Sequence, residues 1–595
     1  MTTPSVSKHR AVTFLVGAGM ALWLVILLVF STTLLLFYAG LCIPGMGIRF
    51  IYEYWFWACG AVVLVALAVA WYCRRLRWLL SRSALTVYLW ASAIVVSLVL
   101  LFYSVESWRG KWMWKELKVE LESRGETLEL MALAPKPVPA EQDFAAVPLI
   151  AEYFDPKVDR RMPARFKKLD LFFFDHPDSV SAMDAVQQAS VMRNELTTWP
   201  RHQTIRLEKW QSYLRIHPDF SLTNALPSPP AAVLLALSRF QGELQELDQA
   251  SHRPYARFPL PYEKGLFGYD AFSKLGEFDA VGEVLQLRAV ARLAVHDTAA
   301  AFQDVQLLLR LIRLLQQEPF SFSDRNRLML LAQQPIYEGL ARRSWSDLQL
   351  ASLQILLQQI DFVPRYQEII RANVLQIIDF MDQLIPIRSG RTQANPISEN
   401  DQAGRWLLTG TRLFYPSGWS LQNQVGAYRA YQERMLTIAD VKHRRISPSA
   451  AREVSREISR HPPSLDPICA VFVLPRISDI PHAVAQLLAY SQASMDQATL
   501  GCALERYRIA HGQFPETLDA LVPRFMAQVP RDVVNGQPMH YRRLPNGQFI
   551  LYSIGWNQTD DGGQVHARVD YHSWHVLGPL QIQHGDWVWQ YPAQK

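Results

Sequence analysis

The sequence predicts a membrane-anchored protein with three N-terminal transmembrane helices, an irregular and mainly α-helical middle domain, and a small α+β domain at the C-terminus. Long apolar runs fill the first part of the 595-residue chain. Apolar side chains recur at helical spacing through the middle, and two strand-like runs flank an Asn-Gly turn near the end. We predict the membrane region at residues 1–104, an interfacial helix and proline-rich connector at 105–142, the helical domain at 143–465 and the α+β domain at 466–595.

Three uncharged apolar runs carry the membrane prediction, at about residues 11–38, 54–72 and 84–103. Each approaches or exceeds the roughly 20 residues that a helix needs to cross the hydrocarbon core of a bilayer. The first run is too long for a removable signal peptide and lacks a clear small-residue cleavage site. We therefore interpret it as an uncleaved signal anchor.

The basic residues around these runs predict which side of the membrane each loop faces. Lys8 and Arg10 precede the first run, and arginines crowd the loop between the second and the third. Because Lys and Arg concentrate on the cytoplasmic side, we predict a cytoplasmic N-terminus. The third run then places everything after Tyr103 on the opposite side of the membrane. A cytoplasmic C-terminal domain is the alternative, and it requires that one run fails to span the membrane.

The net charge of +6 is confined to the membrane region. Residues 1–104 contain seven Lys or Arg and one Glu, which leaves 53 basic and 53 acidic residues in the rest of the chain. A nucleic-acid-binding protein carries its basic excess on the soluble domain. We therefore predict that the partners are the membrane and other envelope proteins, and that nucleic acid is not among them.

A tryptophan cluster and a proline-rich stretch follow the third apolar run. Trp108, Trp112 and Trp114 are typical of the membrane–water interface, where indole rings concentrate. A tryptophan-lined ligand site is the alternative interpretation. The charged residues up to Leu130 predict that the helix continues into water, and prolines between residues 135 and 139 predict its end and a stiff, extended connector.

The middle domain shows helical periodicity most clearly at residues 281–317. A break at residues 296–298 predicts two antiparallel helices, another helix is predicted at 325–341, and Ser346 is the expected N-cap of the next one. Such helix–turn–helix units resemble tetratricopeptide-type repeats, but no clean period of about 34 residues runs through the sequence. We therefore predict an irregular, solenoid-like helical domain.

Residues 499–563 have the pattern of a complete small fold. Apolar side chains at helical spacing over residues 500–507 predict a helix, and Gly512 ends it because glycine accepts the left-handed backbone of a helix C-terminus. A second, short helix is predicted at 515–523, between two prolines. These elements open the predicted α+β domain.

Strand signals follow these helices. Residues 539–543 and 549–554 are predicted to pair as a hairpin across an Asn-Gly turn. Near the end of the chain, an alternating run with Trp587 and Trp589 on one face predicts a last strand that completes the sheet. The alternative is an exposed edge that recruits a partner by strand addition.

This order of elements resembles the C-terminal part of the type II secretion major pseudopilins. The matching motifs are ALERY, HGQFP, LDALVP, NGQP, LYSIG and DDGG, at residues 503–507, 511–515, 518–523, 535–538, 551–555 and 560–563. The resemblance implies a pseudopilin-like α+β fold and a secretion-related role in assembly. It also implies that the membrane is the bacterial inner membrane, with the N-terminus in the cytoplasm and the soluble domains on the periplasmic side. The whole chain is also similar to large bacterial membrane-anchored proteins of uncharacterised activity that carry such a module.

The resemblance to pseudopilins also implies a calcium ion in the loop that follows the hairpin. By position, Asn557, Asp560 and Asp561 would be its ligands, and calcium prefers several hard oxygens. The acidic, glycine-rich run at 560–563 is equally explained as a tight turn. The chain departs from pseudopilins in lacking their glycine–glutamate junction before a single apolar helix, so we expect that it does not polymerise as a pilin does.

The sequence shows no catalytic or cofactor motif. HExxH, GxSxG, GxxxxGK(S/T) and GxGxxG are all absent. We therefore expect a non-catalytic protein that acts in protein–protein interaction or assembly. The alternative is a cell-envelope hydrolase whose site in the helical domain is assembled from residues far apart in the sequence.

Two further groups of side chains are open to alternative interpretations. Three histidines and an aspartate either ligate a metal ion or are exposed loop residues: His566, Asp570, His572 and His575. Cys469 and Cys502 either form a disulfide in an oxidising compartment, or Cys502 is a buried free thiol beside the helix at 500–507.

Overall fold

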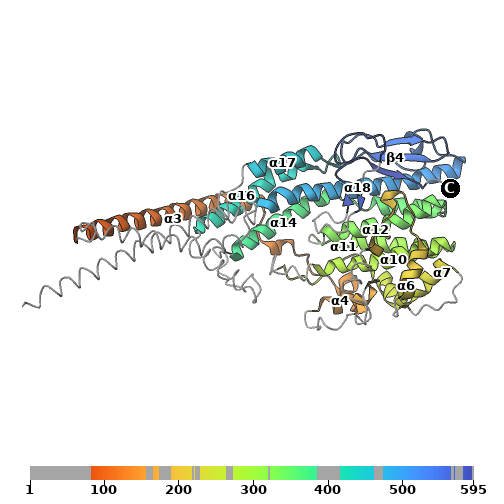
Figure 1. Cartoon of the computed structure of the whole chain (residues 1–595), viewed down its shortest axis with the longest axis horizontal. Helices are drawn as coiled ribbons and strands as arrows, with labels where there is room; N and C mark the ends of the chain where they lie inside the picture. Colours follow the sequence, from red (N-terminus) through yellow and green to blue (C-terminus); the bar gives the residue numbers. More distant parts are fainter. Residues whose placement is uncertain are drawn as a thin grey trace, which may run out of the picture. The chain divides into compact units, whose positions relative to one another are not determined.

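The protein is mainly helical, with small β-sheets towards the C-terminus (Figure 1). The computed structural model describes residues 82–155, 165–172, 189, 191–216, 220, 228–262, 273–318, 322–384, 416–460, 474–564, 568–569 and 580–592. Contacts divide the chain into two compact units. The first comprises residues 1–126, 381–428 and 458–476, and the second comprises residues 127–380, 429–457 and 477–595.

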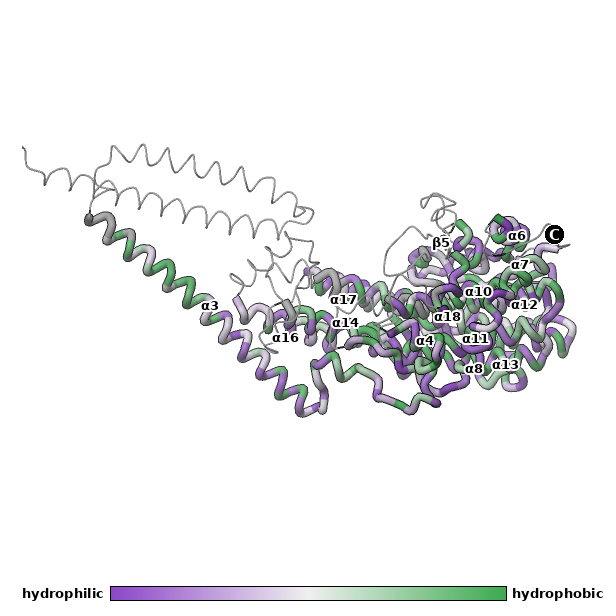
Figure 2. The backbone as a smooth tube through the Cα atoms, turned by 90° about the horizontal axis from the view of Figure 1, so that it is seen from below, coloured by the Kyte–Doolittle hydropathy of each residue, from purple (hydrophilic) through white to green (hydrophobic). Residues whose placement is uncertain are grey.

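The first unit contains α3 (Arg82–Arg124), which includes the predicted third span. Among the described residues it is the one helix that is long and apolar enough to cross a membrane. The predicted spans at 11–38 and 54–72 lie outside the described residues. Hydrophobic residues line the first half of α3, and hydrophilic residues are frequent in its second half (Figure 2).

The end of α3 corrects the prediction for the stretch after the membrane. The helix stops at Arg124, and Gly125 adopts a φ of +66°. The expectation that it continues to Leu130 and ends at the prolines is therefore wrong. Glycine accepts the left-handed backbone that ends a helix, so α3 terminates before the prolines are reached.

The second unit is built around α10 (Phe278–Ala294), which packs against α7, α11 and α12. Thirteen of the 17 residues of α10 are buried, as expected for a helix in the centre of a core. The remaining α-helices in the described part of the chain are α4 (Pro148–Phe154), α6 (Leu207–Ile216), α7 (Pro229–Leu237), α8 (Gln241–Ala250), α11 (Thr298–Leu315), α12 (Phe322–Ala341), α13 (Asp347–Gln358), α14 (Val363–Leu384), α16 (Ser417–Glu433), α17 (Pro448–Arg460) and α18 (Leu474–His511).

The helix boundaries predicted in the middle domain are confirmed. The break at residues 296–298 separates α10 from α11, and the Asp297 carboxylate caps α11 by accepting the Ala300 N–H at 3.2 Å. Ser346 is the N-cap of α13 and forms a capping box with Gln349. These ends are set by local hydrogen bonds, which is why short motifs predict them.

A three-stranded antiparallel sheet forms near the C-terminus, in the order β3 (His540–Arg543), β4 (Phe549–Ser553) and β7 (Trp587–Gln590). The predicted hairpin and the predicted last strand are both confirmed, since β3 and β7 each pair with β4. Two smaller sheets have two strands each: β1 (Ala439–Asp440) with β2 (Arg445–Ile446), and β5 (Arg568–Val569) with β6 (Leu580–Gln581).

The outer edge of β7 is covered by side chains of the helical part of the second unit. The Tyr337 hydroxyl donates to the Gln590 carbonyl at 2.9 Å, and the His202 ring Nε2 lies 3.4 Å from the Val588 carbonyl oxygen. Both tryptophans of the strand are buried. The alternative in which this strand is an exposed edge for strand addition is therefore wrong.

The helix α18 is longer than the predicted helix at 500–507 and ends as predicted before Gly512, whose φ is +80°. It runs between the helices and the sheet of the second unit. On the α12 side, the Gln333 amide contacts the Met495 sulfur at 3.4 Å. On the sheet side, an α18 glutamine donates to a β7 carbonyl at 2.6 Å. The helix α18 is therefore part of the core of the helical part and of the core of the sheet part of the second unit.

The second helix predicted at 515–523 is only a single 3₁₀ turn, Leu518–Leu521. Val522 is extended, with φ of −95° and ψ of 139°. The residue before a proline is disfavoured in the helical region, and Pro523 therefore stops the turn before a full helix forms.

Candidate functional site

The three predicted calcium ligands lie on the one loop that follows β4. The Asn557 side-chain amide donates to the Asp561 Oδ2 at 3.0 Å. The Asp560 Oδ1 accepts the Gly562 N–H at 2.9 Å and the Tyr552 hydroxyl at 3.1 Å. The Gly562 N–H donor also holds the pKa of Asp560 below its usual range. The structure therefore brings these side chains together, and each forms hydrogen bonds within the loop.

A fourth residue, Asp586 at the start of β7, holds this loop against the sheet. Its carboxylate accepts the Asp561 N–H at 3.3 Å and the Gly563 N–H at 2.7 Å. Burial raises the pKa of Asp586, and the nearby Asp560 and Asp561 carboxylates raise it further. Asp586 was not predicted from the sequence, because it lies 25 positions from Asp561, its partner. The only local signal was a Gly-Asp pair directly before an alternating strand.

The loop offers the hard oxygens that calcium prefers, but its protein hydrogen bonds already engage them. Within the described ranges, no three His, Cys, Asp or Glu side chains converge in a group that could hold a metal ion. The structure does not test the calcium site predicted at Asn557, Asp560 and Asp561, and the alternative of a tight turn at 560–563 fits these hydrogen bonds. The histidine group at residues 566–575 lies outside the described residues.

Thermal unfolding with and without calcium tests the loop. We expect the detergent-solubilised chain to unfold at the same temperature in EGTA and in millimolar calcium, because the loop is closed by its own hydrogen bonds. A folded-state site filled at 100 times its Kd would instead add about 2.7 kcal/mol to the free energy of unfolding. A calcium-dependent rise that disappears in Asp560→Ala and Asp561→Ala would establish the calcium site and overturn this expectation.

Cys502 is a buried free thiol, as one of the two interpretations predicted. Burial raises its pKa well above the ordinary range, so the thiol is un-ionised and unreactive. Cys469, its proposed disulfide partner, lies outside the described residues.

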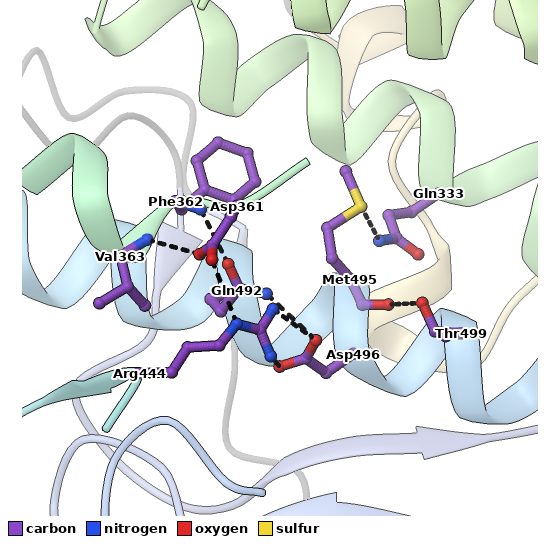
Figure 3. Close-up of polar contacts among 9 residues, drawn as sticks. All are labelled: Gln333, Asp361, Phe362, Val363, Arg444, Gln492, Met495, Asp496 and Thr499. Carbon is purple, nitrogen blue, oxygen red and sulfur yellow. Dashed lines mark hydrogen bonds and ion pairs between the residues drawn. The ribbon is translucent and has the colours of Figure 1, made fainter. Parts of the chain in front are cut away.

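A partly buried polar cluster joins α18 to the segment between α13 and α14 and to the β1–β2 turn (Figure 3). The guanidinium of Arg444 forms two hydrogen bonds to the Asp496 carboxylate, at 3.0 and 3.2 Å. It also reaches the Asp361 Oδ2 at 3.4 Å. One helical turn away from Asp496, the Gln492 amide donates to Asp496 and accepts the Phe362 N–H at 2.8 Å. These bonds tie three separate chain segments together.

The electrostatics of this cluster are those of a desolvated ion pair. Burial raises the pKa of Asp496 to about 6, although Arg444 opposes the rise. Burial would lower the pKa of Arg444, but the two carboxylates raise it above its ordinary value. Asp496 is almost entirely buried, whereas the Arg444 and Asp361 side chains are more than a third exposed. The cluster has a structural role, because the Asp496 carboxylate is removed from water and is hydrogen-bonded to Arg444 and Gln492.

Asp496 makes the stability of the fold depend on pH. Its folded-state pKa of about 6 lies above the ordinary value of about 3.9, so the folded state binds more protons than the unfolded state between these values. Its contribution is fully present below about pH 4 and is lost as the pH rises through about 6, by up to about 3 kcal/mol at 1.36 kcal/mol per pKa unit. We expect urea unfolding to show this slope as a difference between the unmodified chain and Asp496→Asn. Parallel pH profiles in the two proteins would contradict it.

A second cluster of charged side chains lies in the helical part of the second unit. The Glu283 carboxylate is buried and pairs with Arg327 and, at 3.4 Å, with Arg193. The Arg193 guanidinium also lies 3.7 Å from Asp170. Burial and, as the second cause, the nearby Glu283 carboxyl group raise the pKa of Asp170 to about 6. A carboxyl group whose pKa is raised towards neutrality, beside a second buried carboxyl group, is an arrangement that general acid–base chemistry uses.

Comparisons with protein-family models, with curated proteins and with solved structures give no match for this chain.

Proposed function

We propose that the protein is a membrane-anchored component of the bacterial cell envelope that acts through protein–protein interaction or assembly. One observation supports the proposal that the protein is anchored in the membrane. The most apolar window of α3 is entirely unburied, with Trp90 72% and Leu100 62% exposed. Apolar surface in water costs about 25 cal/mol per Å². A helix that is apolar on every side and unburied is stable in a bilayer, where its backbone groups are also paired internally.

The charge distribution of the sequence supports the topology that we propose. The helices at 11–38, 54–72 and 84–103 span the inner membrane, with the N-terminus in the cytoplasm. The chain beyond Tyr103 is then periplasmic. Its equal numbers of basic and acidic residues fit a protein that contacts other envelope proteins and not nucleic acid.

The order of α18, the β3–β4 hairpin and the acidic loop supports a pseudopilin-like α+β module, and with it a secretion-related assembly role. The module shares its core with the helical part of the second unit, through α18 and through the covered edge of β7. A module built into a larger body in this way serves as a fixed docking element. Its attachment differs from that of a pilin subunit.

Membrane extraction tests the anchoring, and native electrophoresis tests the assembly role. We expect the full chain to stay in the membrane pellet after an alkaline carbonate wash, while a variant that lacks residues 1–104 is released. In mild detergent the full chain should migrate in a complex larger than its 68.1 kDa. Release of the full chain by carbonate would refute the anchoring, and migration as a monomer would refute the assembly role.

The Asp170–Glu283 pair favours a second candidate function, a cell-envelope hydrolase. In such an enzyme Asp170 would act as the general acid, with Glu283 as the neighbouring carboxyl group that helps to raise its pKa. The test is hydrolysis of a panel of ester, peptide and glycoside substrates by the purified chain. An activity with a pH limb near 6 that is lost in Asp170→Asn would establish the enzyme and displace the assembly proposal.

A further inference from the structure

We infer that the start of α16 (Ser417–Glu433) lies at the membrane surface, packed on α3 at the point where α3 leaves the bilayer. Its partner there is the lipid headgroup layer. This inference rests on the proposed function, because it requires that α3 crosses the membrane. It concerns the first unit alone and adds to the proposed spans a membrane-contacting segment that lies more than 300 residues along the chain from α3.

The burial of α3 changes sharply after Phe102. From residue 89 to residue 102 every side chain except Ser92 is exposed. Beyond that point the less exposed residues recur at intervals of three and four along one face. They are Tyr103, Glu106, Ser107, Gly110, Met113, Trp114, Leu117, Glu120 and Leu121. The first stretch is therefore suited to lipid, and the second packs against protein on one side.

Two glycines allow α16 to approach the packed face of α3 at backbone distance. A Cβ added to Gly110 would overlap the Gly418 backbone, and a Cβ added to Gly418 would overlap the Glu106 carbonyl. No other residue type fits at this crossing without moving a helix. Only glycine leaves room for two helix backbones to touch in this way.

Side chains around this crossing fix the register of the two helices. The Glu106 carboxylate accepts the Trp419 indole N–H at 3.1 Å and the Gln422 amide at 2.8 Å. The Ser107 and Ser417 hydroxyl oxygens are 3.1 Å apart. The Glu106 side chain is only 14% exposed, so these donors compensate a largely desolvated charge.

A ring contact at this crossing places the start of α16 at the level of the membrane–water interface. The Trp419 ring packs edge-on against Phe102, the last residue of the exposed apolar stretch, with centroids 6.1 Å apart. Trp108 and Trp112 point outward on α3 just beyond this level, at 68% and 56% exposure. Indole rings and basic side chains concentrate at the headgroup layer. Trp419 therefore belongs to the same aromatic belt as Trp108 and Trp112.

A disulfide cross-link tests the contact in membranes. In the full chain, Ser107→Cys with Ser417→Cys should oxidise to a linked pair, because the two hydroxyl oxygens already lie at contact distance. Arg109→Cys with Ser417→Cys is the matched control. Residue 109 lies two positions from residue 107, about 200° around the helix, and its side chain is 58% exposed. We expect tryptic mass spectrometry to find the first link and not the second.

A spin label tests the depth. A nitroxide at Ser417→Cys should be accessible both to oxygen and to a polar nickel reagent, as at a headgroup layer. A nitroxide at Glu122→Cys, about 30 Å along α3 from Phe102, should behave as fully aqueous. A chain that resists carbonate extraction but forms no 107–417 link, or whose label at 417 is fully aqueous, overturns this inference and leaves the proposed anchoring intact. A chain that carbonate releases overturns both.

Discussion

Replacing Arg444 by Met is expected to lower the free energy of unfolding by about 2–4 kcal/mol. Removal of one partner from a buried ion pair typically costs about 3–5 kcal/mol, because the other charge is left desolvated. The expected loss is smaller here because the Arg444 side chain is 37% exposed. Without its guanidinium, the buried Asp496 carboxylate retains only the Gln492 amide at 3.1 Å. Urea unfolding of the detergent-solubilised chain near neutral pH measures the loss.

The double variant Arg444→Met with Asp496→Leu is the matched control. It removes both charges, so no uncompensated carboxylate stays in the core, and it should recover most of the stability. Arg444→Lys should fall between the two, because an ammonium cannot form the two parallel bonds that the guanidinium makes to Asp496. Equal losses in the single and the double variant would show that Arg444 contributes by packing and not by pairing with Asp496.

Trp589→Ala is expected to cost about 3–5 kcal/mol, the range for large-to-small changes of a buried tryptophan. Trp589 is fully buried, and its ring centroid lies 5.7 Å from that of Trp199 and 5.5 Å from that of Tyr337. These partners belong to the helical part of the second unit, whereas Trp589 belongs to β7. The cavity that Trp589→Ala leaves therefore lowers the stability of both the sheet and the helical part. Far-UV circular dichroism and tryptophan fluorescence should show them unfolding together at a lower urea concentration.

A change on the other face of the same strand is the control. Val588 packs with Ile550 and Tyr552 within the sheet, so Val588→Ala should cost less than Trp589→Ala. If Trp589→Ala left the helical signal at its original urea midpoint while the sheet unfolded, the two parts would have separate cores. The claim that they share one would then be wrong.

Local signals in the sequence predicted the parts of the fold that depend on near neighbours. The end of α10 follows from Asp297, whose side chain caps α11 three residues on. The β3–β4 hairpin follows from an Asn-Gly turn in which Gly547 has a φ of +78°. Both features need only a few consecutive residues, which is why pattern reasoning found them.

The parts that were missed depend on partners far apart in the chain. Arg444 meets Asp361 and Asp496, which lie 83 and 52 positions away. The polar residues of α18 give the pattern of a solvated face, yet Gln492 is fully buried and Gln497 nearly so, each with a backbone partner elsewhere in the fold. Composition and spacing carry no information about such pairings, so the length and the burial of α18 could not be predicted.

The orientation of the chain in the membrane is the most direct test of the proposed function. Alkaline phosphatase and green fluorescent protein, fused in turn after Lys595, report the periplasmic and the cytoplasmic side. The proposed three-span topology predicts an active phosphatase and a dark fluorescent protein, and it predicts that deletion of residues 84–103 inverts both signals. A fluorescent C-terminal fusion with inactive phosphatase in the full chain would place the second unit in the cytoplasm and would contradict the proposed envelope function.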